Sequence, residues 1–269
     1  MTDDSHIHLF ERGFKANLLP DAEIEEYEKL RNLGGIDFAL VIGYEGNEHF
    51  KGNNSYILKL AVANPWIHPV SYIDPSSKSA DFQITNALEI GFLGCSFYLI
   101  EQGEKLSENV ISSLNKIGES GAIVSVNANP SAITRYQDQF AQLSTCKILI
   151  SHMGLPGPES AHSQVQIRER MGALLTLRKL PNVFVKLSGL YAVDPIHPYA
   201  GARPYVRELL DSFGASRLMW GSDYSPSMDY GTAAQVASVP DWIAQELTAG
   251  EYERITKSNL RSLLPASVR

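Results

Sequence analysis

Short apolar runs separated by polar and glycine-containing segments recur along the whole chain. Each run is rich in Val, Ile, Leu or Phe and is bounded by Gly, Pro or polar residues, which is the pattern of a β-strand. Several runs, such as Phe-Ala-Leu-Val-Ile-Gly at 38–43, are apolar at consecutive positions, as expected for parallel strands that are buried on both faces. The pattern predicts eight strands: Ser5–Phe10, Asp37–Gly43, Pro69–Ile73, Phe92–Leu99, Ala122–Asn127, Lys147–His152, Asn182–Ser188 and Arg217–Asp223.

Between these runs, apolar residues repeat every three to four positions, which is the period of an amphipathic helix. Val110, Leu114 and Ile117 are one such series. Successive strands begin about 30 residues apart, the length of one βαβ unit. Eight such units predict an α/β protein that forms a single (β/α)8 TIM barrel, with residues 1–269 as one domain. A doubly wound open sheet is the alternative, because a sequence does not reveal whether the sheet closes.

The composition excludes several classes of function. The chain of 269 residues has 30 acidic and 23 basic side chains and a formal net charge of −7, so we expect no binding to nucleic acid or to a membrane surface. Cys95 and Cys146 lie outside any Cys-x-x-Cys motif and predict reduced, buried thiols rather than a disulfide framework or a zinc ribbon. The start at Met1–Asp4 is acidic, unlike a secretory signal, and no apolar run approaches the ~18 residues of a membrane span. These features predict a cytoplasmic protein.

The first predicted strand carries two histidines at alternate positions. In a barrel, the carboxyl ends of the strands hold the catalytic groups. Alternate residues on a strand share a face, so His6, His8 and also Asp4 are expected to point the same way. Two imidazoles side by side on an inward face are typical of a metal-ligand pair. The alternative is a pair of structural histidines.

Two further strands end in side chains that suit the same site. His152 closes the sixth strand and Asp223 closes the eighth. A buried carboxylate is costly unless it is paired or binds a metal, so Asp223 after an apolar run indicates a function. A core histidine and a surface-loop carboxylate are the alternatives for each residue taken alone. Together, however, the strand ends place His6, His8, His152 and Asp223 around one rim of the barrel.

Other polar residues at or after strand ends are candidates for contacts to a substrate. Lys186, at the end of the seventh strand, can bind an anionic group, pair with Asp223 or form a structural ion pair. Arg203 can meet a substrate carboxylate, and a surface role fits it equally well. The full set of candidate substrate contacts is Tyr98, Lys186, Ser188, Tyr191 and Arg203.

Four motifs follow one another along the chain: Asp4-Ser5-His6-Ile7-His8, His152-Met153-Gly154, Val185-Lys186-Leu187-Ser188-Gly189 and Trp220-Gly221-Ser222-Asp223-Tyr224. They resemble the motifs of the amidohydrolase-2 (amidohydrolase-related) family. The closing helix of that family also resembles the segment with Ile255, Asn259 and Leu263. The resemblance implies a metal-dependent-hydrolase type of TIM barrel with a C-terminal closing helix. Members of the family include sugar lactonases, 2-pyrone-4,6-dicarboxylate lactonase, sulfomuconolactone hydrolase and aminocarboxymuconate-semialdehyde decarboxylase.

The resemblance also implies roles for the matching residues. His6 and His8 would be metal ligands, Asp223 a ligand and the general base, and His152 a base or a group that orients the carbonyl. The implied cofactor is a divalent metal ion, with zinc as the first candidate. Some lactonases of this family work without a metal, so a metal-independent enzyme stays open. The expected partner is a small-molecule substrate, and a homo-oligomer is one option for the assembly.

Three positions depart from the family pattern. Zinc-binding relatives such as the decarboxylase supply a further His from strand five, where this chain reads Val124-Ser125-Val126-Asn127, so one ligand is missing. Lactonase relatives often carry Arg after strand four in a Gly-Val-Arg-Phe pattern, where this chain reads Gly94-Cys95-Ser96-Phe97. The Arg that often follows His-x-Gly is Leu155 here. Because the two arginines of the lactonase pattern are missing, we do not expect polyanionic substrates like those of the pyrone lactonase.

We therefore predict a hydrolase that opens a lactone of a small sugar acid or catabolic intermediate by attack of an activated water. The reaction needs a polarised carbonyl, a deprotonated water and a proton for the leaving oxygen. Asp223 would take the proton of the water and pass it to the departing alkoxide, while His152 would stabilise charge on the carbonyl oxygen. The alternatives are a metal-dependent non-oxidative decarboxylase, which the departure at strand five disfavours, and a degenerate barrel that only binds a small molecule.

Overall fold

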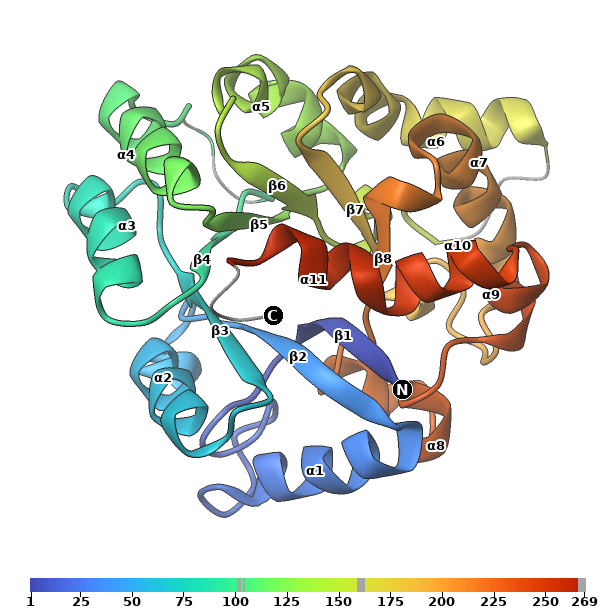
Figure 1. Ribbon diagram of the computed structural model, residues 1–269, viewed down its shortest axis with the longest axis horizontal. Coiled ribbons are helices and arrows are strands. Elements are labelled where there is room, and N and C mark those ends of the chain that lie inside the picture. Colours follow the sequence, from blue (N-terminus) through green and yellow to red (C-terminus); the bar gives the residue numbers. More distant parts are fainter. Residues whose placement is uncertain (101–102, 104, 159–162, 266–269) are drawn as a thin grey trace.

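The computed structural model describes residues 1–100, 103, 105–158 and 163–265, and eight parallel strands follow one another in chain order around a barrel (Figure 1). Each strand pairs with the next one along the chain. The predicted (β/α)8 barrel is therefore confirmed. The strands are β1 (Thr2–Ile7), β2 (Ile36–Ile42), β3 (Ile67–Tyr72), β4 (Gly94–Tyr98), β5 (Ile123–Asn127), β6 (Lys147–Ile150), β7 (Val183–Leu187) and β8 (Leu218–Trp220).

The largest differences from the predicted strands are at β1 and β8. β1 begins at Thr2 rather than Ser5, because Asp3 and Asp4 are buried with partners inside the fold and an apolar run cannot reveal this. β8 ends at Trp220 rather than Asp223. The backbone of Asp223 is left-handed, with φ of 57°, and such a residue cannot continue an extended strand.

The barrel closes between β8 and β1 without a regular ladder. A single bridge joins Ile7 to Tyr224, and the backbone N–H of Asp223 donates to the His6 carbonyl at 2.9 Å. Gly221 permits this close approach, since a Cβ at this position would lie 2.9 Å from His6 N. Closure excludes the doubly wound open sheet that the sequence left possible.

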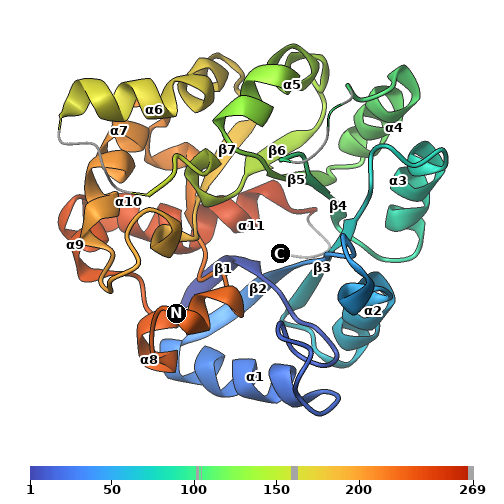
Figure 2. The same ribbon diagram turned by 180° about the vertical axis from the view of Figure 1, so that it is seen from behind.

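Helices cover the outside of the barrel, as Figures 1 and 2 show from opposite sides. α4 illustrates how the sequence builds them: the Ser107 side chain caps the first turn by accepting from the Val110 N–H, and Val110, Leu114 and Ile117 are buried toward the strands. The helices are α1 (Ala22–Gly34), α2 (Asn53–Ala63), α3 (Ala80–Glu89), α4 (Glu108–Glu119), α5 (Pro130–Gln142), α6 (Gln164–Thr176), α7 (Arg203–Phe213), α8 (Ala233–Val236), α9 (Asp241–Gln245), α10 (Ala249–Glu253) and α11 (Asn259–Leu263).

The last helical segment seals the amino-terminal end of the barrel. α10 continues through a π-helical turn at Arg254–Ser258 into α11, which crosses that end in Figure 1. Leu260 and Leu263 of α11 belong to one buried apolar cluster with inward-facing strand residues such as Leu40 and Leu149. This arrangement confirms the predicted closing helix and leaves the opposite end of the barrel for polar side chains.

The two cysteines and the lengths of the helices bear on two further predictions. Cys95 and Cys146 are both free and buried, as expected for reduced core thiols. Within the described part of the chain, no helix combines the length and the apolar character needed to cross a membrane.

Candidate active site

His6 and His8 are buried near the open, carboxyl-terminal end of the barrel. We expected Asp4 on their face, and this expectation is wrong. The pairing of β1 with β2 shifts register between Asp4 and Ile7, so that three steps along β1 match two steps along β2. The extra residue of such a β-bulge turns the strand over and ends the simple alternation. Asp4 consequently contacts Tyr27 of α1 instead of joining the histidines.

Asp4 holds together the two chain segments that carry the predicted ligands. Its carboxylate accepts the backbone N–H of His6 at 3.1 Å and that of Ser222 at 2.9 Å, and the Tyr27 hydroxyl donates to it at 3.2 Å. Burial raises the pKa of Asp4 to about 6, while these hydrogen bonds favour its charged form. Since Ser222 directly precedes Asp223, Asp4 fixes the backbone next to both His6 and Asp223.

His6, His8 and Asp223 converge on one point. The two Nε2 atoms are 3.2 Å apart, and Asp223 Oδ1 lies 3.7 Å from His6 Nε2 and 3.9 Å from His8 Nε2. Ligands placed about 2.0–2.2 Å from a tetrahedral zinc ion are roughly 3.3–3.6 Å apart. The three side chains are thus spaced nearly as they would be around one divalent ion.

Hydrogen bonds on the far sides of the rings decide which nitrogen faces this point. His8 Nδ1 donates to the Ile42 carbonyl at 2.8 Å, so the Nε2 lone pair of neutral His8 is directed at the group. His6 Nδ1 lies 3.3 Å from Ser151 Oγ and 3.2 Å from Lys186 Nζ. When His6 Nδ1–H donates to Ser151, its Nε2 lone pair can bind a cation. When Lys186 donates instead, the His6 proton sits on Nε2 and bonds to His8. The residues therefore fit a divalent ion and also form a complete hydrogen-bonded arrangement of their own.

His152 approaches Asp223 from the other side. Its Nδ1 lies 3.6 Å from Asp223 Oδ2 and 3.0 Å from Ser188 Oγ. Ser188 Oγ accepts the His152 backbone N–H at 3.3 Å. When Ser188 Oγ–H also donates to Nδ1, the proton of the neutral His152 ring is on Nε2. Gly189 makes room for the ring, since a Cβ there would lie 2.6 Å from His152 Nδ1. The Tyr191 hydroxyl donates to Asp223 Oδ2 at 2.7 Å.

Left-handed backbone conformations coincide with the site. The φ angles are 53° at His152 and 57° at Asp223, and Met153 and Leu155 continue the turn with φ of 54° and 49°. A residue other than glycine costs roughly 1–2 kcal/mol in this region, and such strain persists where the surrounding contacts impose it. Strain of this kind concentrates at functional sites, which supports a functional role for the strand ends with His152 and Asp223.

Burial dominates the electrostatics of the cluster. It raises the pKa of Asp223 to about 6, although His8 and Lys186 act to lower it. It lowers the pKa of His152 to about 3, and the charge of Lys186 acts in the same direction. Burial also lowers the pKa values of His6 and His8. At neutral pH the cluster therefore combines an ionised carboxylate with neutral imidazoles.

Lys186 lies in the barrel interior beside this cluster and is fully buried. Its Nζ donates to Ser125 Oγ at 2.9 Å and approaches His6 Nδ1 at 3.2 Å. Burial lowers the pKa of Lys186 to about 7, while Asp223 and Asp4 act to raise it. We predicted a contact with a substrate anion or a pair with Asp223. The contacts in the structure instead suit Lys186 to orienting the His6 ring.

Three tyrosines line the rim at the ends of β2, β3 and β4. We call Tyr44, Tyr72 and Tyr98 the tyrosine wall. The ring of Tyr44 lies 4.5 Å from that of Tyr98 and 5.5 Å from that of Tyr72, centroid to centroid. Burial, followed by the nearby charge of Asp223, raises the pKa of Tyr98 well above its usual range. Tyr98 is a residue we predicted from the sequence. Tyr44 and Tyr72 are not among the predicted residues, although their positions at the ends of β2 and β3 were a signal that could have found them.

Arg203 has a different partner from the substrate carboxylate we considered. At the start of α7, its guanidinium pairs with Glu246 at 2.5 Å, and Arg207 binds the same carboxylate at 2.6 Å. These contacts occupy the guanidinium. The structure thus favours the surface role of Arg203 over the substrate-binding role, and it brings the other predicted site residues, His6, His8, Tyr98, His152, Lys186, Ser188, Tyr191 and Asp223, to the open end.

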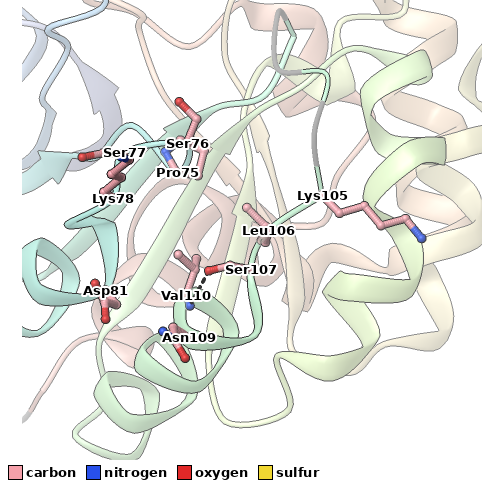
Figure 3. Close-up of a pocket in the computed structure, with 10 residues that line it drawn as sticks. All are labelled: Pro75, Ser76, Ser77, Lys78, Asp81, Lys105, Leu106, Ser107, Asn109 and Val110. Carbon is pink, nitrogen blue, oxygen red and sulfur yellow. Dashed lines mark hydrogen bonds between the residues drawn. The ribbon is translucent and has the colours of Figure 1, made fainter.

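A cavity of about 230 Å³ lies away from this cluster, between residues 75–81 and the start of α4 (Figure 3). Its lining includes Lys78, Lys105 and Ser107, and the predicted site residues are not part of it. Ser107 already serves there as the cap of α4, to which the dashed line in Figure 3 corresponds. The cavity brings together no set of groups suited to catalysis.

A comparison with known protein families decides the classification. A family model described as Amidohydrolase matches residues 3–265. The chain belongs to the amidohydrolase family. This confirms the resemblance drawn from the motifs, and we class the protein as a hydrolase.

Solved structures share the whole fold. An amidohydrolase from Burkholderia multivorans, solved once with bound HEPES and once with bound zinc, is 19% identical, and the superpositions cover 98% of this chain and 100% of that chain with TM-scores of 0.83 and 0.81. A putative 2-pyrone-4,6-dicarboxylic acid hydrolase from Pseudomonas putida is 22% identical, with 97% and 96% of the chains covered and a TM-score of 0.76. At these identities the likeness establishes the fold.

One curated relative matches part of the chain. The L-fucono-1,5-lactonase of Burkholderia ambifaria is 42% identical over 82 residues, which are 30% of this chain and 27% of that protein. The alignment thus spans about a quarter of the relative's length.

Proposed function

We propose that this protein hydrolyses the ester bond of a lactone. The observation that carries the proposal is the buried Asp223 carboxylate, held among three neutral imidazoles at the open end of the barrel. A carboxylate with a pKa near 6 can accept a proton from water and return it within one catalytic cycle. The partial match to a lactonase supports this class of ester as the substrate.

Asp223 and His152 divide the chemical work. Asp223 takes one proton from a water molecule, and the resulting hydroxide adds to the lactone carbonyl carbon. The bond from that carbon to the ring oxygen then breaks, and Asp223 returns the proton to the departing alkoxide. In the tautomer in which Ser188 donates to Nδ1, His152 carries its proton on Nε2 and donates a hydrogen bond to the carbonyl oxygen as negative charge develops there.

Other residues of the site hold this pair in place. Tyr191 fixes Asp223 through Oδ2, which leaves Oδ1 facing the two histidines of β1. Ser188 fixes the ring of His152. A divalent ion bound by His6, His8 and Asp223 would supply Lewis-acid polarisation of the reacting oxygens. We propose zinc as that ion, since nitrogen and carboxylate ligands at this spacing suit it and the Burkholderia multivorans relative was solved with zinc.

The surface beside the site favours an uncharged substrate. A groove of about 610 Å³ reaches the tyrosine wall at Tyr72 and is bordered by Glu45, Glu48 and Asp74, with Lys51 as a basic residue. Three acidic side chains and one basic side chain line this groove, so it would repel a polyanionic lactone. We therefore propose a neutral lactone, such as that of a sugar acid.

The decarboxylase alternative has less support. Its zinc-binding relatives supply an additional histidine from strand five, and strand five of this chain, Val124-Ser125-Val126-Asn127, contains no histidine. A barrel that only binds a small molecule would hydrolyse no lactone of a test panel. Release of carbon dioxide from a candidate acid would identify the decarboxylase directly.

The test is a panel of sugar lactones assayed for acid release with purified protein. Each lactone is assayed with the protein as purified, with the protein after chelation, and with the protein after addition of zinc. The metal content of the protein is measured in parallel. We expect hydrolysis well above the spontaneous rate that is lost in the Asp223→Asn variant. If no lactone in the panel reacts faster than its blank under any of the three conditions, the proposed function is wrong.

A further inference from the structure

Asn127 closes β5 on the inward face of the barrel. Ser125, two residues earlier, contacts Lys186 in the interior, and alternate residues of a strand share a face. Asn127 also pairs in register with Tyr98 of the tyrosine wall. The carboxyamide thus lies at the rim, next to the wall and on the face that leads to the cluster.

The Asn127 side chain lies beside Tyr98 and acts to lower the pKa of the Tyr98 hydroxyl, against the effect of burial. The Asn127 Oδ1 atom is buried, and among the residues that the structure describes none donates to it. A buried acceptor without a donor costs about 1–3 kcal/mol, and at the rim of the candidate site such an atom suits a ligand that supplies the missing hydrogen.

We propose that Asn127 Oδ1 accepts a hydroxyl group of the substrate, which makes Asn127 a specificity-determining residue for hydroxylated, uncharged lactones. An acceptor selects a ligand that carries a donor, and an ionised carboxylate on a substrate carries none. The adjacent tyrosine wall offers apolar ring surface for the C–H face of the same molecule. This inference rests on the proposed function, whose substrate class it names.

The experiment compares two substrates that differ in their hydroxyl groups. The probes are the hexono-1,5-lactone that reacts fastest in the panel and δ-valerolactone, which has the same ring and no hydroxyl. For Asn127→Leu we expect kcat/KM on the hexonolactone to fall 10- to 100-fold, mainly through KM, and kcat/KM on δ-valerolactone to change less than threefold. Asn109→Leu, at an exposed position of α4, is the matched control and should leave both values unchanged.

An equal fall in kcat/KM on both lactones would show a structural role for Asn127. An unchanged kcat/KM on both would show that Asn127 does not contact the substrate. Both results overturn the proposal. If Asn127→Leu does not fold, judged by circular dichroism, Asn127→Ala takes its place with the same expectations.

A binding measurement separates this inference from the proposed function. A 1,5-anhydrohexitol has the hydroxyls of the sugar lactone but no ester, and tetrahydropyran has neither. By isothermal titration we expect the anhydrohexitol to bind the wild type at least tenfold more tightly than Asn127→Leu. Lactones that do not react, together with this tenfold difference, would reject the hydrolase chemistry and retain the hydroxyl site. Equal binding by both proteins, or none by the wild type, would overturn the hydroxyl site itself.

Discussion

Asp3 and Asp223 are buried carboxylates at opposite ends of the barrel, and their surroundings differ. Asp3, at the sealed end, accepts two charged hydrogen bonds from the Arg261 guanidinium, from Nε at 2.6 Å and from Nη2 at 2.7 Å. Asp223, at the open end, accepts a hydrogen bond from Tyr191 at 2.7 Å and faces three imidazoles at 3.6–3.9 Å.

The comparison separates stability from reactivity. Burial raises the pKa of both carboxyls, and at Asp3 a bidentate cation opposes that effect. Asp223 has a weaker set of partners and a left-handed backbone, so it keeps its charge available and stabilises the fold less. Substitutions at the sealed end should therefore lower the stability of the fold, whereas substitutions at the open end should lower the activity without unfolding the protein.

The largest expected effect is at the open end. Asp223→Asn should lower kcat on the best lactone about 10³-fold, because an amide cannot take the proton of the water. Steady-state kinetics on the purified variant measure this loss. Retention of full hydrolytic activity would contradict the assignment of Asp223 as the base.

The same substitution should not weaken the fold. The raised pKa of Asp223 means that the folded protein prefers the protonated acid, so ionisation of Asp223 lowers the stability of the fold progressively between a pH of about 4 and about 6 and keeps it lowered above that range. Asp223→Asn should therefore be about 1–2 kcal/mol more stable than the wild type at pH 7, and this advantage should vanish below pH 4. Urea unfolding at both pH values measures the difference, and a large loss of stability at pH 7 would contradict the comparison.

At the sealed end, Arg261→Ala should unfold the protein more easily. Removing one partner leaves Asp3 buried without its cation, and because Arg261 is 30% exposed we expect a loss of roughly 2–3 kcal/mol, below the cost for a fully buried pair. The kcat of the remaining folded protein should match the wild type. A fall in kcat with unchanged stability would reverse the roles of the two ends.

Tyr191→Phe tests how Asp223 is tuned. Burial sets the raised pKa of Asp223, and the hydrogen bond from Tyr191 acts to lower it. Since Asp223 must be ionised to act as a base, wild-type activity should decline as pH falls below about 6. Without the Tyr191 hydroxyl that decline should begin at a higher pH, with kcat about tenfold lower at neutral pH. A pH profile that stays in place would mean that Tyr191 does not act on Asp223.

The smallest expected effect concerns the outer partner of the same arginine. Asp37 pairs with Arg261 at 2.6 Å, but its side chain is 42% exposed. Asp37→Asn should cost less than about 0.5 kcal/mol, since exposed ion pairs contribute little, and kcat should not change. A cost as large as that of Arg261→Ala would show that burial is not what distinguishes Asp3 from Asp37.

Local patterns in the sequence were sufficient for the order of the elements and for the core of the candidate site. Apolar runs and helical periods depend on neighbouring residues, so eight strands and their helices could be predicted. His6, His8, His152 and Asp223 could be selected because each stands at the end of such a run. The barrel geometry then brings strand ends to one rim.

Contacts between distant residues decided what the sequence left open. The bulge in β1 that turns Asp4 away from His6 depends on its pairing with β2. Arg261, the partner of Asp3, is 258 positions away in the chain. That Asn127 Oδ1 lacks a hydrogen-bond donor depends on where all the neighbouring side chains lie in the folded protein. Burial, pairing and strain are properties of the assembled neighbourhood of a residue, and a linear pattern records none of them.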